Sequence, residues 1–247
     1  MPDNAPGRLR LKDRLSEEGG LLRKPLQGLI FDFDGLIVDT ETARYYAWKE
    51  VIEAHGVELP LSFWQENIGL PREAFDPLEL LERKAGKPVD REAVQRRKQA
   101  IFESRMGNES LRPGVREYIE EGQRRELKLA ICSSSPRKWV VSNLARYGID
   151  GVFDAMVTGS EASAIKPHPE LYLRVLDMLS LPAKWCIAFE DSPKGVQSAR
   201  AAGIFCVAVA NSITAKTDLS AADVQLSSLA EMPLGELEKR FSRAVRK

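Results

Sequence analysis

The sequence predicts an α/β fold, in which a parallel sheet is covered by helices on both faces and carries an insertion made of helices. Two observations support this prediction. From residue 112 onward, continuous apolar segments of strand length alternate with amphipathic helical segments, which is typical of such a sheet. Residues 42–111, in contrast, show helical patterns and no clear strand, so we expect them to form a separate layer.

The first strand is expected in the run Leu29–Gly35, where apolar residues surround Asp32 and Asp34. Carboxylates in a buried strand would be unpaired charges unless they lie at its end beside a cation. Side chains two positions apart point to the same face of a strand, so both aspartates can serve one site. Gly35 allows the chain to turn where a side chain would block that site. The simpler alternative is an Asx-turn at the end of the strand.

The insertion follows this first strand directly. Its predicted helices are residues 43–54, 61–67, 72–84 and 91–106. The sequence Arg112–Pro113–Gly114 has the composition of a turn and marks the return to the sheet. We expect the inserted helices to form a lid over the carboxyl ends of the strands. The predicted domains are a flexible N-terminal extension (1–26), a core (27–42 and 112–247) and a helical cap (43–111).

The remaining elements follow in strict alternation. Strands are predicted at 127–133, 155–158, 185–189, 205–210 and 224–226, and helices at 115–125, 137–147, 169–179 and 194–202. The strand at 185–189 runs into Glu190 and Asp191, which repeats the pattern of an apolar strand ending in a pair of carboxylates. Ligands bind at the carboxyl ends of strands in such sheets, so both acidic pairs lie where a site is expected.

Composition limits the classes of partner. Lys+Arg and Asp+Glu both number 36 and the sequence pI is about 6.8, which argues against nucleic acid or an anionic membrane as a partner. The sequence has no membrane-spanning apolar stretch and no apolar core of a secretory signal. Cys132, Cys186 and Cys206 lie in separate apolar runs and predict buried, reduced thiols. We expect a cytoplasmic protein, a monomer or weak dimer.

Four polar segments, each at a predicted strand end or just before a helix, suit phosphoryl transfer. They are Asp32–Gly35, Ser133, Lys166 and Glu190–Asp191. A carboxylate can attack phosphorus, and a second carboxylate can protonate the leaving group and then activate water. A Mg²⁺ ion held by carboxylates, a lysine and a hydroxyl can neutralise the phosphoryl group. Taken singly, Ser133 would be read as a helix cap and Lys166 as a solvated charge.

With these motifs, the sequence resembles the haloacid dehalogenase superfamily, specifically the beta-phosphoglucomutase-like phosphatases with a helical cap after the first strand. The resemblance covers residues 27–230 and includes all of the superfamily's motifs. It implies a Rossmann-like core. It also implies that Asp32 is the nucleophile and a Mg²⁺ ligand, and that Asp34 is the general acid/base and binds the metal through its backbone carbonyl.

The same resemblance assigns the other site residues. Ser133 and Lys166 would bind the transferring phosphoryl group. Asp191 would be a metal ligand, and Glu190 beside it would either bind the metal directly or contact one of its ligands. Arg72, in a segment that resembles the substrate-specificity loop, would hold a second anionic group of the substrate. The alternative for Arg72 is a solvated side chain in the first turn of a helix.

We therefore expect a Mg²⁺-dependent phosphatase of a small phosphorylated metabolite, a sugar or polyol phosphate, that acts through an aspartyl-phosphate. Asp34 favours phosphate esters, because family members that cleave carbon–halogen bonds lack the acid/base aspartate. A mutase of the beta-phosphoglucomutase type is the alternative, weakened by Arg44 near the position of that enzyme's cap histidine. A non-catalytic binding module is a third reading, although no motif residue is missing.

Overall fold

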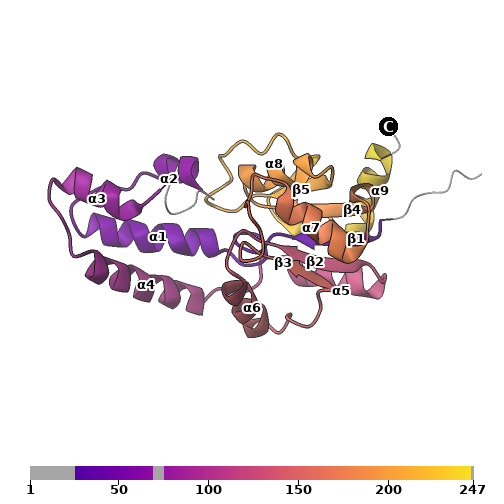
Figure 1. Cartoon of the computed structure of the whole chain (residues 1–247), viewed down its shortest axis with the longest axis horizontal. Helices are drawn as coiled ribbons and strands as arrows, with labels where there is room; N and C mark the ends of the chain where they lie inside the picture. The colour runs from indigo at the N-terminus through magenta and orange to yellow at the C-terminus, as the bar shows by residue number, and fades with distance from the viewer. Residues whose placement is uncertain (1–25, 69–74, 246–247) are drawn as a thin grey trace, which may run out of the picture.

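The computed structural model describes residues 26–68 and 75–245 and contains a six-stranded parallel sheet (Figure 1). The strands are β1 (Gly28–Phe31), β2 (Lys128–Cys132), β3 (Ala155–Val157), β4 (Cys186–Glu190), β5 (Phe205–Val209) and β6 (Val224–Leu226). Their order is β3-β2-β1-β4-β5-β6, and every neighbouring pair is parallel. The predicted α/β fold class is confirmed.

Helices precede or follow each strand, as the alternating pattern predicts. The helices are α1 (Thr40–Glu53), α2 (Leu61–Asn67), α3 (Pro77–Ala85), α4 (Arg91–Gly107), α5 (Val115–Arg124), α6 (Arg137–Arg146), α7 (Glu170–Leu179), α8 (Pro193–Ala201) and α9 (Leu234–Ala244). Two short 3-10 helices, η2 (Ala183–Trp185) and η3 (Leu229–Glu231), complete the described elements. The sheet and α5–α9 lie together on the right of Figure 1, and α1–α4 extend away from them on the left.

The central strand β1 is buried on both faces, which explains its continuous apolar sequence. Phe31 points into a cluster that contains residues of α5, α6 and α9, and its ring stacks on that of Phe189 with centroids 4.9 Å apart. The neighbouring Ile30 points the other way, into a cluster with Tyr172 of α7 and Val196 of α8. Alternating side chains therefore fix two layers of helices against the sheet, and the strand ends emerge at one edge between them.

Two predicted helix starts in the insertion were wrong. The first helix begins at Thr40 rather than at residue 43, because Asp39 caps it by accepting a hydrogen bond from the Thr42 N–H (3.1 Å). The third begins at Pro77 rather than at residue 72, because Asp76 accepts the Leu78 N–H and proline is favoured in the first turn. The predicted start of that helix, Arg72, lies outside the described residues.

The two linkers between the inserted helices and the sheet run side by side. Val38 forms an antiparallel bridge with Leu111, and the Arg112 N–H donates to the Ile37 carbonyl over 2.9 Å. The division into core and cap stays a prediction. Of the N-terminal extension, residues 1–26, the structure describes only Leu26, which is buried.

The predictions about the cysteines and about membrane-spanning segments can be compared with the described residues. The three cysteines are buried and form no disulfide. Across residues 26–68 and 75–245, none of the helices combines the length and apolar character that crossing a bilayer requires.

Candidate active site

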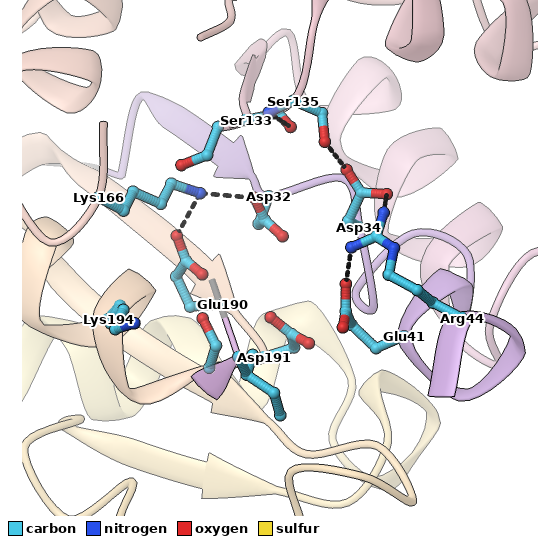
Figure 2. A pocket seen from close by; sticks show the side chains of 13 residues that line it. Asp32, Asp34, Glu41, Arg44, Ser133, Ser135, Lys166, Glu190, Asp191 and Lys194 are labelled. Atoms are coloured by element: carbon cyan, nitrogen blue, oxygen red, sulfur yellow. Dashed lines mark hydrogen bonds and ion pairs between the residues drawn. The ribbon is translucent and has the colours of Figure 1, made fainter. Parts of the chain in front are cut away.

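The four polar segments of the sequence meet at the carboxyl edge of the sheet (Figure 2). The strand order explains why, because β1 lies between β2 and β4, and Phe31 is in register with Ile131 on one side and Phe189 on the other. Asp32, Ser133 and Glu190 therefore end three adjacent strands, although more than 50 residues separate each from the next in the chain. Lys166 comes from the loop before α7.

Lys166 is the cation at the centre of this arrangement. Its buried Nζ donates to Asp32 Oδ1 (2.5 Å) and to the Cys132 carbonyl (2.7 Å), and it lies 2.7 Å from Glu190 Oε1. Burial alone would lower the pKa of Lys166, but the two carboxylates raise it well above the ordinary lysine value. The ammonium therefore remains charged and is held in place by three acceptors.

Asp32, Glu190 and Asp191 form a cluster of buried carboxylates. Each offers one oxygen, and these oxygens lie within 4.8 Å of one another. Burial raises the pKa of Asp32 to about 8, against the effect of Lys166, and burial and Asp32 raise the pKa of Asp191. Glu190 Oε2 is buried without a hydrogen-bond partner among the described residues. Carboxylate oxygens are ligands that Mg²⁺ prefers, and an unpaired one in such a cluster fits an ion of this kind.

Two glycines bring the backbone against these carboxylates. Gly35 has φ of +79°, and a Cβ built on it would lie 2.1 Å from Asp191 Oδ2. A Cβ on Gly195, in the first turn of α8, would lie 1.7 Å from Glu190 Oε2. The side chain of Asn211 also holds Asp191, donating from Nδ2 to Oδ2 over 2.8 Å. The cluster is thus fixed by close backbone approach as well as by hydrogen bonds.

The loop that carries Asn211 also reaches the inserted helices. Ile213 is buried among their apolar side chains, and its carbonyl accepts a hydrogen bond from Gln65 of α2 (2.5 Å). The hydroxyl of Ser212 lies 2.6 Å from that of Thr42 of α1. One short loop therefore contacts both the carboxylate cluster and the cap.

The Asp34 carboxylate lies apart from the cluster. Its Oδ1 accepts hydrogen bonds from the Thr40 hydroxyl (2.8 Å) and the Trp139 indole N–H (3.0 Å), and lies 3.8 Å from the Arg44 guanidinium. Its Oδ2 accepts one from the Ser135 hydroxyl (2.5 Å). Asp34 and Asp32 share one pocket in different surroundings, so the pair can divide two chemical roles between them.

The other cations of the pocket differ in their partners. Arg44 lies 2.5 Å from Glu41, which raises the pKa of the guanidinium, while burial raises the pKa of Glu41. The Nζ of Lys194 is buried and has no hydrogen-bond partner among the described residues, and burial lowers its pKa. Lys194 therefore differs from Arg44 in that its charged group contacts no carboxylate among the described residues.

A protein-family model described as haloacid dehalogenase-like hydrolase matches residues 29–209, which is most of the chain. The chain belongs to this family. It is 40% identical over 212 residues to the YhcW protein of Bacillus subtilis (strain 168), covering 86% of this chain and 96% of YhcW. It is 34% identical over 181 residues, 72% of this chain and 82% of the relative, to a Thermotoga maritima protein named phosphorylated carbohydrates phosphatase.

Solved structures of the family have the same fold. The CbbY protein of Rhodobacter sphaeroides, solved in complex with phosphate, superposes with a TM-score of 0.66 and 26% identity, covering 83% of this chain and 96% of CbbY. The prediction of a haloacid dehalogenase-like enzyme of the beta-phosphoglucomutase-like branch, a phosphoric monoester hydrolase, is confirmed.

Most of the site residues predicted from the sequence lie in the pocket, and some pocket residues were not predicted. All predicted residues except Arg72 line one pocket; Arg72 lies outside the described residues. Sequence reasoning placed Arg44 near the position of the mutase's cap histidine but gave no role to Glu41 or Lys194. A signal for Lys194 existed, since it stands three residues after Asp191, in the first turn of the helix that starts at this edge.

Proposed function

We propose that this chain is a Mg²⁺-dependent phosphatase that hydrolyses a small phosphorylated sugar or polyol through a phosphoryl group carried on Asp32. The observation that carries the proposal is the charge of the pocket. Its described lining has five carboxylates and three cations, which leaves a formal charge of two negative, the complement of one divalent cation. These residues are Asp32, Asp34, Glu41, Glu190, Asp191, Arg44, Lys166 and Lys194.

The residues present fit Mg²⁺. The side chains of Asp32, Glu190 and Asp191, with the backbone carbonyl of Asp34, would hold the ion. When bound, it supplies positive charge that offsets the charge on the phosphoryl oxygens. The chain's own contribution is to hold three carboxylates together in one buried place, where Lys166 contacts Asp32 and Glu190 and the amide of Asn211 donates to Asp191.

The first step forms a bond between a carboxylate oxygen of Asp32 and phosphorus and breaks the bond from phosphorus to the leaving oxygen. Asp34 gives its proton to that oxygen, which departs as an alcohol. Lys166 and the Ser133 hydroxyl hold the other phosphoryl oxygens. In the second step Asp34 takes a proton from water, the water oxygen bonds to phosphorus, and inorganic phosphate leaves as Asp32 is restored.

The substrate class is supported by charge and by relatives. Lys194 offers an unused ammonium inside the pocket, which suits an anionic or polyhydroxylated substrate. A Streptomyces hygroscopicus relative, 29% identical, is named validoxylamine A 7'-phosphate phosphatase, and a mutant of Rhodobacter sphaeroides CbbY was solved with xylulose-(1,5)bisphosphate. We further propose Arg72 as a contact to a distal anion. The proposal also includes a cytoplasmic monomer or weak dimer with no nucleic-acid partner.

The test is phosphate release from a panel of phosphorylated sugars, polyols and acids, with Mg²⁺ and with EDTA. We expect release that needs Mg²⁺ and that Asp32→Asn abolishes while thermal unfolding stays near that of wild type. Activity of Asp32→Asn within tenfold of wild type would rule out Asp32 as the nucleophile. The mutase alternative is separated by ³¹P NMR, because a mutase would yield an isomeric sugar phosphate and require a bisphosphate for turnover.

A further inference from the structure

Trp139 lies behind Asp34, outside the residues that line the pocket. It stands in the first turn of α6, and its indole N–H donates to Asp34 Oδ1 over 3.0 Å. The first turn of α6 is also tied to the helix interior, because Asn143 donates from its side chain to the Trp139 carbonyl (2.9 Å). The indole is therefore a donor fixed on a helix of the core.

The indole also packs against the inserted helices. Its ring lies 5.7 Å, centroid to centroid, from the ring of Phe102 on α4, at an interplanar angle of 36°. Phe102 is buried, and the ammonium of Lys98 lies 4.9 Å from its centroid. Trp139 thus makes one contact to the carboxylate and one to the helical insertion.

The partners of Asp34 are unequal in chemistry. An indole N–H and a guanidinium can only donate hydrogen bonds, whereas a hydroxyl can donate or accept them. Trp139, Arg44 and the Thr40 hydroxyl face Oδ1, and Ser135 alone is hydrogen-bonded to Oδ2 among the described residues. A proton on Oδ1 would oppose the indole N–H. A proton on Oδ2 requires only that the Ser135 hydroxyl turn from donor to acceptor.

We propose that Trp139 is a positioning residue for Asp34: its N–H keeps Oδ1 as an acceptor, so that Oδ2 carries the proton exchanged with the leaving group. Through Phe102, the same indole makes the orientation of the carboxylate depend on the position of α4. This inference rests on the proposed function, in which Asp34 is the acid and base of the reaction.

Trp139→Phe removes the N–H and keeps an aromatic ring against Phe102. The matched control is Trp185→Phe, because Trp185 precedes β4 and its buried indole nitrogen has no hydrogen-bond partner in the part of the chain that the structure describes. Each variant is assayed with the best sugar phosphate and with p-nitrophenyl phosphate, whose leaving group departs without a proton. The quantity compared is kcat/KM, which covers the steps up to departure of the leaving group and leaves out attack by water.

We expect Trp139→Phe to lower kcat/KM for the sugar phosphate by roughly tenfold or more, since hydrogen bonds to charged groups are of that strength. The value for p-nitrophenyl phosphate should stay within about twofold, and Trp185→Phe should change neither, because proton donation matters only for the poor leaving group. Equal losses with both substrates, or no loss with either, would overturn the proposal.

A second measurement does not depend on activity. The chain has four tryptophans, so a ¹H–¹⁵N spectrum shows their indole N–H resonances, and Trp139→Phe identifies one of them by its absence. Asp34→Ala should shift this resonance and leave the other three in place. An unmoved resonance would refute the contact. If wild type released no phosphate from any substrate, the proposed function would fail, and this spectrum would still decide whether Trp139 holds Asp34.

Discussion

The contact between Gly195 and Glu190 gives a prediction that the structure lets us work through. Gly195 is helical, so Gly195→Ala would by itself favour α8 by roughly 1 kcal/mol. The added Cβ, however, would stand 1.7 Å from Glu190 Oε2, where real Cβ contacts stay beyond 3.0 Å. The carboxylate must therefore move by about 1.3 Å. That displacement disrupts its contacts with Tyr172 (2.5 Å) and Lys166 (2.7 Å).

The expected result is a weaker metal site on a folded protein. Loss of a group that orients a metal site typically costs about 10–100-fold in metal affinity. We expect the Mg²⁺ concentration for half-maximal phosphatase activity to rise by that factor in Gly195→Ala. The control is Gly235→Ala in α9, where an added Cβ would meet nothing within 4 Å. A Mg²⁺ requirement within about threefold of wild type, with Gly195→Ala folded, would refute our assignment of Glu190 to the metal site.

Three further variants test separate roles. Asp34→Asn should lower turnover by about 10²–10⁴-fold, while the Mg²⁺ affinity measured by titration changes little because the backbone carbonyl remains. A collapse of Mg²⁺ binding would contradict our assignment of proton transfer to the Asp34 side chain. Lys194→Met should raise KM for the anionic substrate by roughly tenfold without lowering the unfolding temperature, because the lost ammonium has no hydrogen-bond partner among the residues that the structure describes. A less stable protein with unchanged KM would make Lys194 structural. Arg72→Ala should lower kcat/KM by about 10- to 150-fold for a bisphosphate or phosphorylated acid and leave p-nitrophenyl phosphate nearly unaffected; equal losses would point to a structural role instead.

The motif residues could be predicted because their positions depend on local pattern and on sheet topology alone. Asp32 and Glu190 end continuous apolar strands, and parallel strands deliver their carboxyl ends to one edge. The start of α3 was missed although its signal was present, since Asp76 followed by Pro77 is a cap followed by a favoured first residue.

Other parts of the site depend on long-range packing that no local pattern contains. Ser135, in the loop after β2, and Trp139, in α6, lie more than 100 residues from Asp34 in the chain, and their donors meet its carboxylate only in the folded structure. A lysine in a first helical turn is usually solvated, so the local sequence does not predict that Lys194 Nζ is buried without a hydrogen-bond partner within residues 26–68 and 75–245. Ile213 lies far from the insertion in the chain, and only the folded structure shows that it packs among the apolar side chains of the inserted helices.

The loop of Asn211 and Ile213 links two equilibria, the movement of the inserted helices and the binding of a cation. Any movement that takes the inserted helices away from the sheet must expose Ile213, which is 2% accessible, at a cost on the order of 1.5–3 kcal/mol. The same movement pulls on the segment whose amide holds Asp191. Coupling between two processes is reciprocal, so if closure of the cap strengthens the hold on a cation, the cation must favour closure by the same factor. Magnesium would then act as an effector of cap position as well as a cofactor, and the open enzyme would bind it less tightly than the closed one.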